Sequence, residues 1–315
     1  MRAAVVHAFG SPPVFGHYDE PEAGEGETVV NVSVAPLSPI VKSLAAGKHY
    51  ASGAAAGFVP GIDGVGTDAA GRRVYFLFPK PPFGSMAEKT LVATSSVVPV
   101  PEGVADERAA AVVTAGLSSW VALRSRAEFQ AGETVLINGA TGSAGALAVQ
   151  IATNLGASRI IATGRNETKL ASLPEAVDKI PLDQNADEAL RRAFLEGVDV
   201  VLDYLWGEPA TRIIAAATAN RGSSAGEPRL RYVQIGSIAG ESIAISAHSL
   251  RSSGLEILGC GIGSLSMNEL VAGAGELLAA IPEAGFDTPV RTLPLSAVAE
   301  AWEDGADDYR LVLRA

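Results

Sequence analysis

Three glycines, Gly139, Gly142 and Gly145, separate an apolar run from a segment with helical periodicity. Residues 135–138 are the apolar run, and residues 143–155 carry apolar side chains at every third or fourth position, as a helix packed on one side does. A glycine-rich turn between a strand and a helix binds phosphate, because the first N–H groups of the helix are unpaired and the helix dipole favours an anion.

Each glycine of this turn has a role in the dinucleotide-binding pattern. The first allows the tight turn, the second lets a pyrophosphate approach the backbone, and the third lets helix and strand pack closely. The spacing therefore predicts a dinucleotide site formed by Gly139, Thr141, Gly142, Ser143, Ala144 and Gly145. The alternative is a tight turn that holds no ligand. A nucleophile elbow does not fit, since it requires glycine where Thr141 stands.

The residues after the next apolar run indicate which dinucleotide is bound. A carboxylate about twenty residues after the turn would bind the adenosine ribose, but Arg165 stands there. A cation suits the 2′-phosphate of NADP and accepts no hydrogen bond from ribose hydroxyls. We therefore expect NADP(H), held here by Gly164, Arg165, Asn166 and Lys169. The alternative is that Arg165 is a solvated residue at the start of a helix, which Asn166 would cap.

The middle of the chain has the pattern of a parallel sheet. Apolar runs alternate with helical segments, at residues 135–138, 159–163, 198–202, 231–235 and 255–259. Such strands are covered by helices on both faces, and ligands bind at their carboxyl ends. This rule adds four cofactor contacts to the prediction: Gly236, Ser237, Gly261 and Ile262. For Gly261 and Ile262 the alternative is a flexible loop.

The segments before and after this region differ from it. Short apolar or alternating runs between Pro and Gly predict a small barrel or sandwich, at residues 3–8, 28–35, 73–78, 89–92 and 96–99. Residues 106–123 are Ala-rich and predict a helix. Near the end of the chain, residues 293–302 predict a turn and a helix, and residues 311–313 predict a closing strand.

Composition narrows the class of protein. A chain of 315 residues with 48% hydrophobic residues is long enough for two domains and too apolar to be disordered. With 24 basic and 35 acidic residues the net charge is −11, which disfavours nucleic acids and anionic membranes as partners. The single cysteine, Cys260, excludes an internal disulfide and a cysteine-rich zinc site. No run is apolar enough for a signal peptide or a membrane span, so we expect a soluble cytoplasmic protein.

Together these motifs resemble the medium-chain dehydrogenase/reductase superfamily, specifically its zinc-independent quinone oxidoreductase-like branch. The resemblance covers almost the whole chain and is carried by residues 59–66, 84–88, 109–123, 138–145, 198–203 and 294–301. It implies an α/β protein with a GroES-like β-barrel catalytic domain, residues 1–112 and 262–315. The cofactor domain, residues 113–261, would be a Rossmann domain with a doubly wound parallel sheet. A homodimer joined near residues 255–261 is also implied.

The resemblance implies reduction without zinc. Zinc-using members have a His-Glu pair where this chain has Ile62 and Asp63, and no cysteine precedes them here, so no metal site is expected. Without a Lewis acid, oxidising a simple alcohol is difficult because nothing stabilises the alkoxide. Quinones and enones need only hydrogen-bond donors and a proton, since the charge spreads to oxygen.

The substrate side departs from the family pattern. The family's Asn-x-x-Asp segment and the Tyr that follows correspond to Ser38, Val41 and Ser43, and its Thr-Ala beside the nicotinamide corresponds to Ser118-Ser119. The catalytic candidates are Ser43, Tyr50 and Ser118. The alternatives are a loop hydroxyl bonded to its own backbone for Ser43, a surface aromatic for Tyr50 and an ordinary helix serine for Ser118.

The sequence is therefore consistent with three functions. The first is an NADPH-dependent oxidoreductase that transfers hydride to a quinone or an α,β-unsaturated carbonyl, with a small-molecule substrate. The second is an enoyl-thioester reductase of secondary metabolism, which would need a basic groove for a carrier's phosphopantetheine. The third is a non-catalytic NADP(H)-binding sensor or structural protein, which would bind NADPH tightly and turn over no acceptor.

Overall fold

The computed structural model describes residues 1–50, 52–53, 55–305 and 308–315. The chain forms two compact units, Met1–Leu117 with Ser266–Ala315, and Ser118–Leu265. The first unit is therefore discontinuous in sequence, and the second is inserted into it. Among the described residues, no helix is long and apolar enough to cross a membrane.

The first unit is built mainly on antiparallel strands. These are β1 (Arg2–Val5), β2 (Val14–His17), β3 (Glu27–Leu37), β4 (Asp63–Asp68), β5 (Arg73–Leu77), β6 (Lys89–Ala93), β7 (Val97–Pro99), β14 (Val290–Pro294) and β15 (Arg310–Arg314). β1 pairs with β2, and the larger sheet has the order β14-β15-β3-β4-β5-β7, with β6 also on β3. The long strand β3 pairs with β15 near its carboxyl end and with β6 near its amino end, so the last strand of the chain closes onto an early one.

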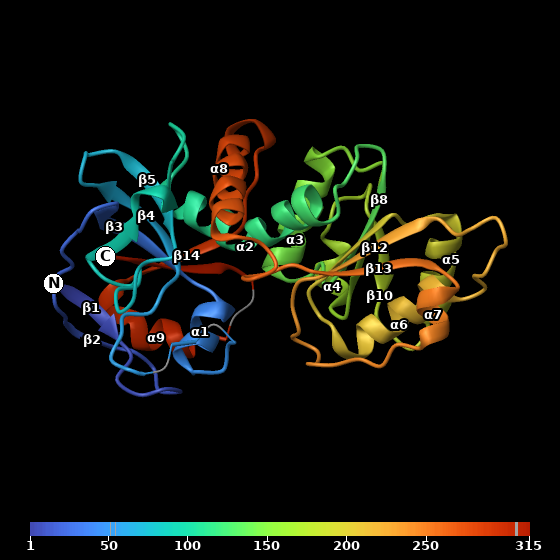
Figure 1. The fold of residues 1–315 in the computed structure, drawn as a ribbon, viewed down its shortest axis with the longest axis horizontal. Helices are drawn as coiled ribbons and strands as arrows, with labels where there is room; N and C mark the ends of the chain where they lie inside the picture. Colours follow the sequence, from blue (N-terminus) through green and yellow to red (C-terminus); the bar gives the residue numbers. More distant parts are fainter. Residues whose placement is uncertain (51, 54, 306–307) are drawn as a thin grey trace. The chain divides into compact units, whose positions relative to one another are not determined.

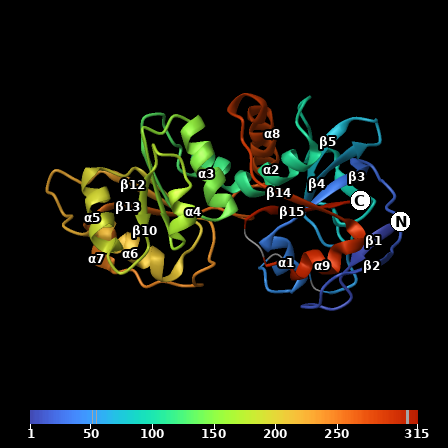
Figure 2. The same cartoon turned by 180° about the vertical axis from the view of Figure 1, so that it is seen from behind.

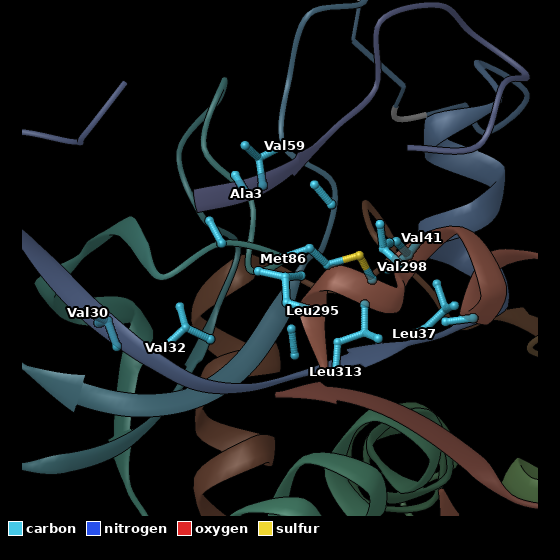
Figure 3. Packing of buried hydrophobic residues seen from close by; sticks show 14 of the residues in the cluster. Ala3, Val30, Val32, Leu37, Val41, Val59, Met86, Leu295, Val298 and Leu313 are labelled. Carbon is cyan, nitrogen blue, oxygen red and sulfur yellow. The ribbon is translucent and has the colours of Figure 1, made fainter. Parts of the chain in front are cut away.

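Among the described residues, four α-helices belong wholly or partly to this unit: α1 (Pro39–Ala45), α2 (Asp106–Val121), α8 (Met267–Ala284) and α9 (Val298–Glu303). The boundary after Leu117 falls inside α2. Figure 3 shows the Met86 side chain among side chains from β1, β3, α1, α9 and β15. Val41 and Val298 anchor α1 and α9 to this core, which fixes the segment that carries Ser43.

The second unit contains a six-stranded parallel sheet. Its strands are β8 (Thr134–Asn138), β9 (Arg159–Gly164), β10 (Asp178–Pro181), β11 (Val200–Asp203), β12 (Arg229–Gln234) and β13 (Gly254–Gly259), in the order β10-β9-β8-β11-β12-β13. All five pairings are parallel. The order reverses direction between β8 and β11, which is the point where doubly wound sheets bind ligands. The predicted fold class is confirmed.

Helices cover both faces of this sheet. They are α3 (Ser143–Asn154), α4 (Glu167–Ala171), α5 (Ala186–Glu196), α6 (Gly207–Thr218) and α7 (Ala247–Arg251). α5 and α6 pack on one face, where Leu190 and Ile213 join Leu136 and Ile161 in one core. α3 and α4 lie on the opposite side of the sheet in both views (Figures 1 and 2). The central strands β8, β9 and β11 are buried on both faces, which explains why they read as continuous apolar runs, whereas the edge strand β13 is partly exposed.

Some elements were not expected from sequence. β4 contains Gly64 and Gly66, and β10 is four residues long and ends in Pro181. Neither has a strong periodic pattern, because glycine contributes no apolar signal and short edge strands have few buried side chains. A Cβ on Gly66 would lie 2.2 Å from the Asn31 carbonyl oxygen, so close contact with β3 requires this residue.

Candidate functional site

The glycine-rich turn begins where β8 ends. Gly139 has φ +96°, a conformation that favours glycine, and Gly139 and Ala140 both donate backbone hydrogen bonds to the Thr163 carbonyl at 3.1 and 2.9 Å. The turn is thus tied to the carboxyl end of β9. Gly142 is the N-cap of α3 and has extended backbone geometry.

Packing within the protein places different demands on the second and third glycines of the turn. A Cβ on Gly145 would lie 2.3 Å from the Gly139 carbonyl oxygen, so the third glycine lets α3 pack against the turn. A Cβ on Gly142 would meet nothing closer than that same oxygen at 3.7 Å. Packing within the protein therefore does not require glycine at position 142. A role in admitting a ligand stays a prediction for this residue.

The first turn of α3 offers unpaired donors. Within the described residues, the N–H groups of Ser143 and Ala144 have no protein acceptor, as expected for the start of a helix. Gly164 lies against Thr141, where a Cβ would come within 2.5 Å of the threonine Cγ2. The turn and the end of β9 thus form one continuous surface, which fits a pyrophosphate at α3 and a ribose beside β9.

The predicted 2′-phosphate residues lie at the start of α4. Arg165 is exposed and makes no ion pair with a described residue. Asn166 caps α4 through its side chain, which accepts a hydrogen bond from the Lys169 backbone N–H at 3.0 Å. The predicted cap is confirmed, whereas the contacts of Arg165 and Lys169 with a phosphate stay a prediction.

The loops after β12 and β13 both lie at the carboxyl ends of the parallel strands. The Gly236 N–H donates to the Asp203 carbonyl at 3.1 Å, and a Cβ on Gly236 would lie 2.6 Å from the Tyr204 carbonyl oxygen. Ser237 follows in this loop. Gly261 donates its N–H to Ser264 Oγ at 2.8 Å, and Ile262 forms a bridge with Leu265. The structure brings these loops together because the strands are parallel, and their cofactor contacts stay predictions.

A buried polar network lies beneath the turn. The Asp203 carboxylate accepts hydrogen bonds from Asn138 Nδ2 at 2.7 Å and Tyr232 Oη at 2.7 Å, and Thr163 Oγ1 donates to Asn138 Oδ1 at 2.8 Å. These four residues come from four neighbouring strands and are all buried. Sequence reasoning did not assign them to the site. The usable signal was a polar residue at the end of β8 and of β11 and at the penultimate position of β9.

A second cluster surrounds Ser118. Its carbonyl oxygen lies 3.8 Å from Cys260 Sγ, while the neighbouring Ser119 is buried with its hydroxyl 2.5 Å from Tyr204 Oη. Burial raises the pKa of Tyr204 and raises that of Cys260 to about 11. Cys260, which directly follows β13, is therefore a buried neutral thiol.

No family model matches the chain. A probable NADPH-dependent quinone reductase of Emericella nidulans is 29% identical, over 96% of this chain and 97% of its own length. The crystal structure of the quinone oxidoreductase of Thermus thermophilus, also solved in complex with NADPH, has a TM-score of 0.81 at 28% identity and covers both chains completely.

The curated and structural neighbours of this chain are quinone oxidoreductases of the medium-chain dehydrogenase/reductase superfamily, consistent with the predicted quinone oxidoreductase-like branch. The chain also matches part of a much larger protein of Mycobacterium tuberculosis, a phenolphthiocerol/phthiocerol polyketide synthase, at 30% identity over 258 residues. That match covers 80% of this chain and 11% of the synthase chain.

Two catalytic candidates of this quinone oxidoreductase-like chain lie in its first unit. Ser43 is in α1, and its carbonyl accepts a hydrogen bond from the Lys48 N–H at 3.0 Å. Tyr50 is 73% exposed, and its ring lies 4.1 Å from the His49 ring between centroids. Ser118 belongs to the second unit. The catalytic roles of all three stay predictions.

Asp63, which the family resemblance aligns with the Glu of zinc-using members, takes part in a buried hydrogen-bond cluster in this quinone oxidoreductase-like chain. Asp63 is buried, and its Oδ2 accepts hydrogen bonds from Tyr75 Oη and Thr114 Oγ1, both at 2.5 Å. Burial raises the pKa of Asp63 to about 6, although the two hydroxyl donors and the nearby Arg310 lower it. Within the described ranges, no three His, Cys, Asp or Glu residues are arranged to hold a metal ion.

Proposed function

We propose that this protein is an NADPH-dependent oxidoreductase that transfers hydride from NADPH to a quinone or an α,β-unsaturated carbonyl. The observation that carries the proposal is the glycine-rich turn at the reversal point of the parallel sheet, with unpaired N–H donors at Ser143 and Ala144. The NADPH-dependent quinone reductase among the relatives and the quinone oxidoreductase solved with NADPH support it.

The residues of the second unit fit the cofactor. The N–H groups of Ser143 and Ala144 would bind the pyrophosphate, which Gly142 admits because it carries no Cβ. Arg165 and Lys169 would bind the 2′-phosphate by charge-assisted hydrogen bonds. The backbone of Ser237, Gly261 and Ile262 would border the nicotinamide end. When bound, NADPH supplies the hydride, and the protein supplies binding, orientation and hydrogen-bond donors.

The reaction we propose does not use zinc. Ile62 has no ligand atom, and the Asp63 oxygen Oδ2 is saturated by Tyr75 and Thr114. The positive charge of Arg310 close to Asp63 further disfavours a metal cation. A conjugated acceptor suits such a site, because donors such as the Ser43 hydroxyl would stabilise the oxygen that gains negative charge.

A second function is favoured by one observation. The match to a polyketide synthase supports reduction of an enoyl thioester, which is also a conjugated C=C bond. The two substrate classes share the same hydride chemistry and differ in the carrier. A non-catalytic NADP(H)-binding protein is the third possibility, supported by the departures from the family pattern at Ser38, Val41 and Ser43.

We further propose a homodimer joined through β13. This strand lies at the edge of the six-stranded sheet, so its outer hydrogen-bonding groups are open to a second copy. Ile257 on β13 is 36% exposed. An Ile257→Arg variant should shift the mass measured by light scattering from dimer to monomer. Leu195→Arg on α5, at a side chain 74% exposed, is the control and should leave the mass unchanged.

A cytoplasmic location is part of the same proposal. The single cysteine is a buried free thiol, which suits a reducing compartment. Fractionation of cells that express the tagged full chain tests it, and recovery outside the cytoplasmic fraction would contradict it.

The decisive test of function is an assay of NADPH oxidation. We expect turnover with 1,4-benzoquinone or a simple enone, and none with primary alcohols plus NADP. Turnover of a crotonyl thioester far above both would identify the enoyl-thioester reductase. Tight NADPH binding without turnover on any acceptor would identify the non-catalytic protein. If NADPH does not bind at all in a calorimetric titration, the cofactor assignment is wrong.

A further inference from the structure

The Asp203 carboxylate is buried completely and is neutralised by no cation among the described residues. Four donors surround it instead. Oδ1 accepts from Asn138 Nδ2 at 2.7 Å, from the Leu205 N–H at 2.9 Å and from the Trp206 N–H at 3.1 Å. Oδ2 accepts from Tyr232 Oη at 2.7 Å. Because hydrogen bonds to a charged group are stronger than neutral ones, this carboxylate holds its neighbours firmly.

One arm of this network reaches the glycine-rich turn. Asn138 is the residue directly before Gly139, and its Oδ1 accepts a hydrogen bond from Thr163 Oγ1 at 2.8 Å. The carbonyl of Thr163 in turn accepts hydrogen bonds from Gly139 and Ala140. The turn is therefore held from two strands. On β8, the Asn138 side chain is hydrogen-bonded to Asp203, and on β9, Thr163 is hydrogen-bonded both to the Asn138 side chain and to the backbone of the turn.

The other arm holds the segment that follows β11. Trp206 has φ +54° and ψ −158°, a conformation that a side-chain-bearing residue rarely adopts. The hydrogen bond from its N–H to Asp203 helps to keep it there. The next residue, Gly207, lies against the Ala239 carbonyl, where a Cβ would approach to 2.5 Å.

The two arms meet across the turn. A Cβ built on Gly139 would lie 3.0 Å from Leu205 Cδ2 and 3.5 Å from Tyr204 Cβ, so the segment after β11 packs directly on the first glycine. On its other side, the Tyr204 carbonyl lies against Gly236. One buried carboxylate thus connects the turn after β8 with the segment after β11, which in turn contacts the loop after β12.

We infer that Asp203 is a positioning residue for NADPH: its side-chain hydrogen bonds set the glycine-rich turn and residues 204–207 in one arrangement without touching the cofactor. The inference rests on the proposed function, since it assigns NADPH to this edge of the sheet. Its consequence is specific. Loss of the carboxylate contacts to Asn138 and Trp206 raises the Kd and KM for NADPH, while kcat at saturating NADPH changes little, because no catalytic group is removed.

The test compares three variants by calorimetric titration with NADPH and by steady-state kinetics. Asp203→Asn keeps the shape but removes the charge, and Asn138→Ala removes only the arm to the turn. Tyr232→Phe is the matched control, since it removes one buried hydrogen bond to the same carboxylate and keeps the ring that contacts Trp206. We expect about tenfold or weaker NADPH binding for the first two, from loss of charge-assisted hydrogen bonds. Tyr232→Phe should bind within about twofold of the wild type.

The outcomes separate the inference from the proposed function. If the wild-type protein does not bind NADPH, the proposed function fails. If the wild type binds and Asn138→Ala binds equally well, the positioning role is overturned. It is also overturned if all three variants lose affinity in proportion to their loss of thermal stability, since the network then serves folding alone. Should Asp203→Asn fail to fold, the pair Asn138→Ala and Tyr232→Phe still decides.

Discussion

The carbonyl oxygen of Gly139 occupies the place that a side chain on Gly145 would need. A Cβ there would lie 2.3 Å from that oxygen and 2.7 Å from the Ala140 Cα, both backbone atoms that cannot move independently. We therefore expect Gly145→Ala to lower the free energy of unfolding by about 1–3 kcal/mol or more, because the helix must shift away from the strand. Urea unfolding measures this change, and an unchanged midpoint would contradict the close packing.

Gly142→Ala should behave in the opposite way. The added Cβ meets nothing closer than 3.7 Å, so stability should change by no more than about 0.5 kcal/mol. If the pyrophosphate contacts this backbone, NADPH binding should nevertheless fall at least about tenfold. The two glycine variants are controls for each other, because Gly145→Ala should lower stability and Gly142→Ala should lower NADPH affinity. Wild-type affinity in Gly142→Ala would remove this residue from the cofactor site.

Arg165→Ala tests the preference for NADPH over NADH. Arg165 is exposed and has no ion-pair partner among the described residues, so its removal should not alter folding. Losing one charge-assisted phosphate contact corresponds to about 1.5–3 kcal/mol, or a roughly 10- to 150-fold weaker NADPH affinity, with NADH binding unchanged. Arg192→Ala, on the exposed side of α5, removes the same charge and should leave both affinities unaltered. Equal loss in both variants would indicate a general charge effect.

Asp63 gives the stability of the protein a specific pH dependence. Its pKa in the folded protein is about 6, above the ordinary value of 3.8, so the folded state binds more protons between these values. From this group alone, stability is greatest below about pH 4 and declines as the pH rises to about 6. Asp63→Asn lacks this titration. It should therefore gain stability relative to the wild type across that range, by at most about 3 kcal/mol.

Asp68→Asn is the control for this comparison, because the pKa of Asp68 is shifted in the opposite direction to that of Asp63. Burial raises the pKa of Asp68, but hydrogen bonds and the ion pair with Arg72 outweigh this and lower it overall. Its carboxylate thus stabilises the fold above the ordinary pKa and loses that contribution as the pH falls. Urea unfolding from about pH 3 to pH 7 should show Asp68→Asn losing stability relative to the wild type as the pH rises through the acidic end of this range. A gap for Asp63→Asn that is independent of pH would refute the raised pKa.

Cys260 should be almost unreactive in the folded protein. Burial raises its pKa to about 11, so the thiolate fraction near neutral pH is about 100-fold below that of an ordinary cysteine. Labelling with a thiol reagent should be slow in buffer and should reach one thiol per chain in denaturant, since the sequence has one cysteine. Rapid stoichiometric labelling of the native protein would show that the thiol is accessible.

Local patterns explain what could be predicted. The apolar runs of β8, β9, β11, β12 and β13 and the stripe of α3 depend on side-chain spacing within a few residues, which a sequence displays directly. The same holds for the turn at Gly139 and the cap at Asn166. β4, with two glycines and few apolar side chains, gave no such signal, because its place is decided by pairing with β3 and β5.

The sequence by itself determined the class of this protein: a parallel-sheet domain with a glycine-rich turn, a cation after the second strand, and β-rich segments before and after this domain along the chain. Only the tertiary structure decided which polar groups meet. The hydrogen-bonded partners of the buried network lie 25 to 65 residues apart in the sequence; the network consists of Asn138, Thr163, Asp203 and Tyr232. They meet because β9, β8, β11 and β12 are neighbours in the sheet. Strand order and register follow from the free energy of burying the whole sheet, which no local window of sequence contains.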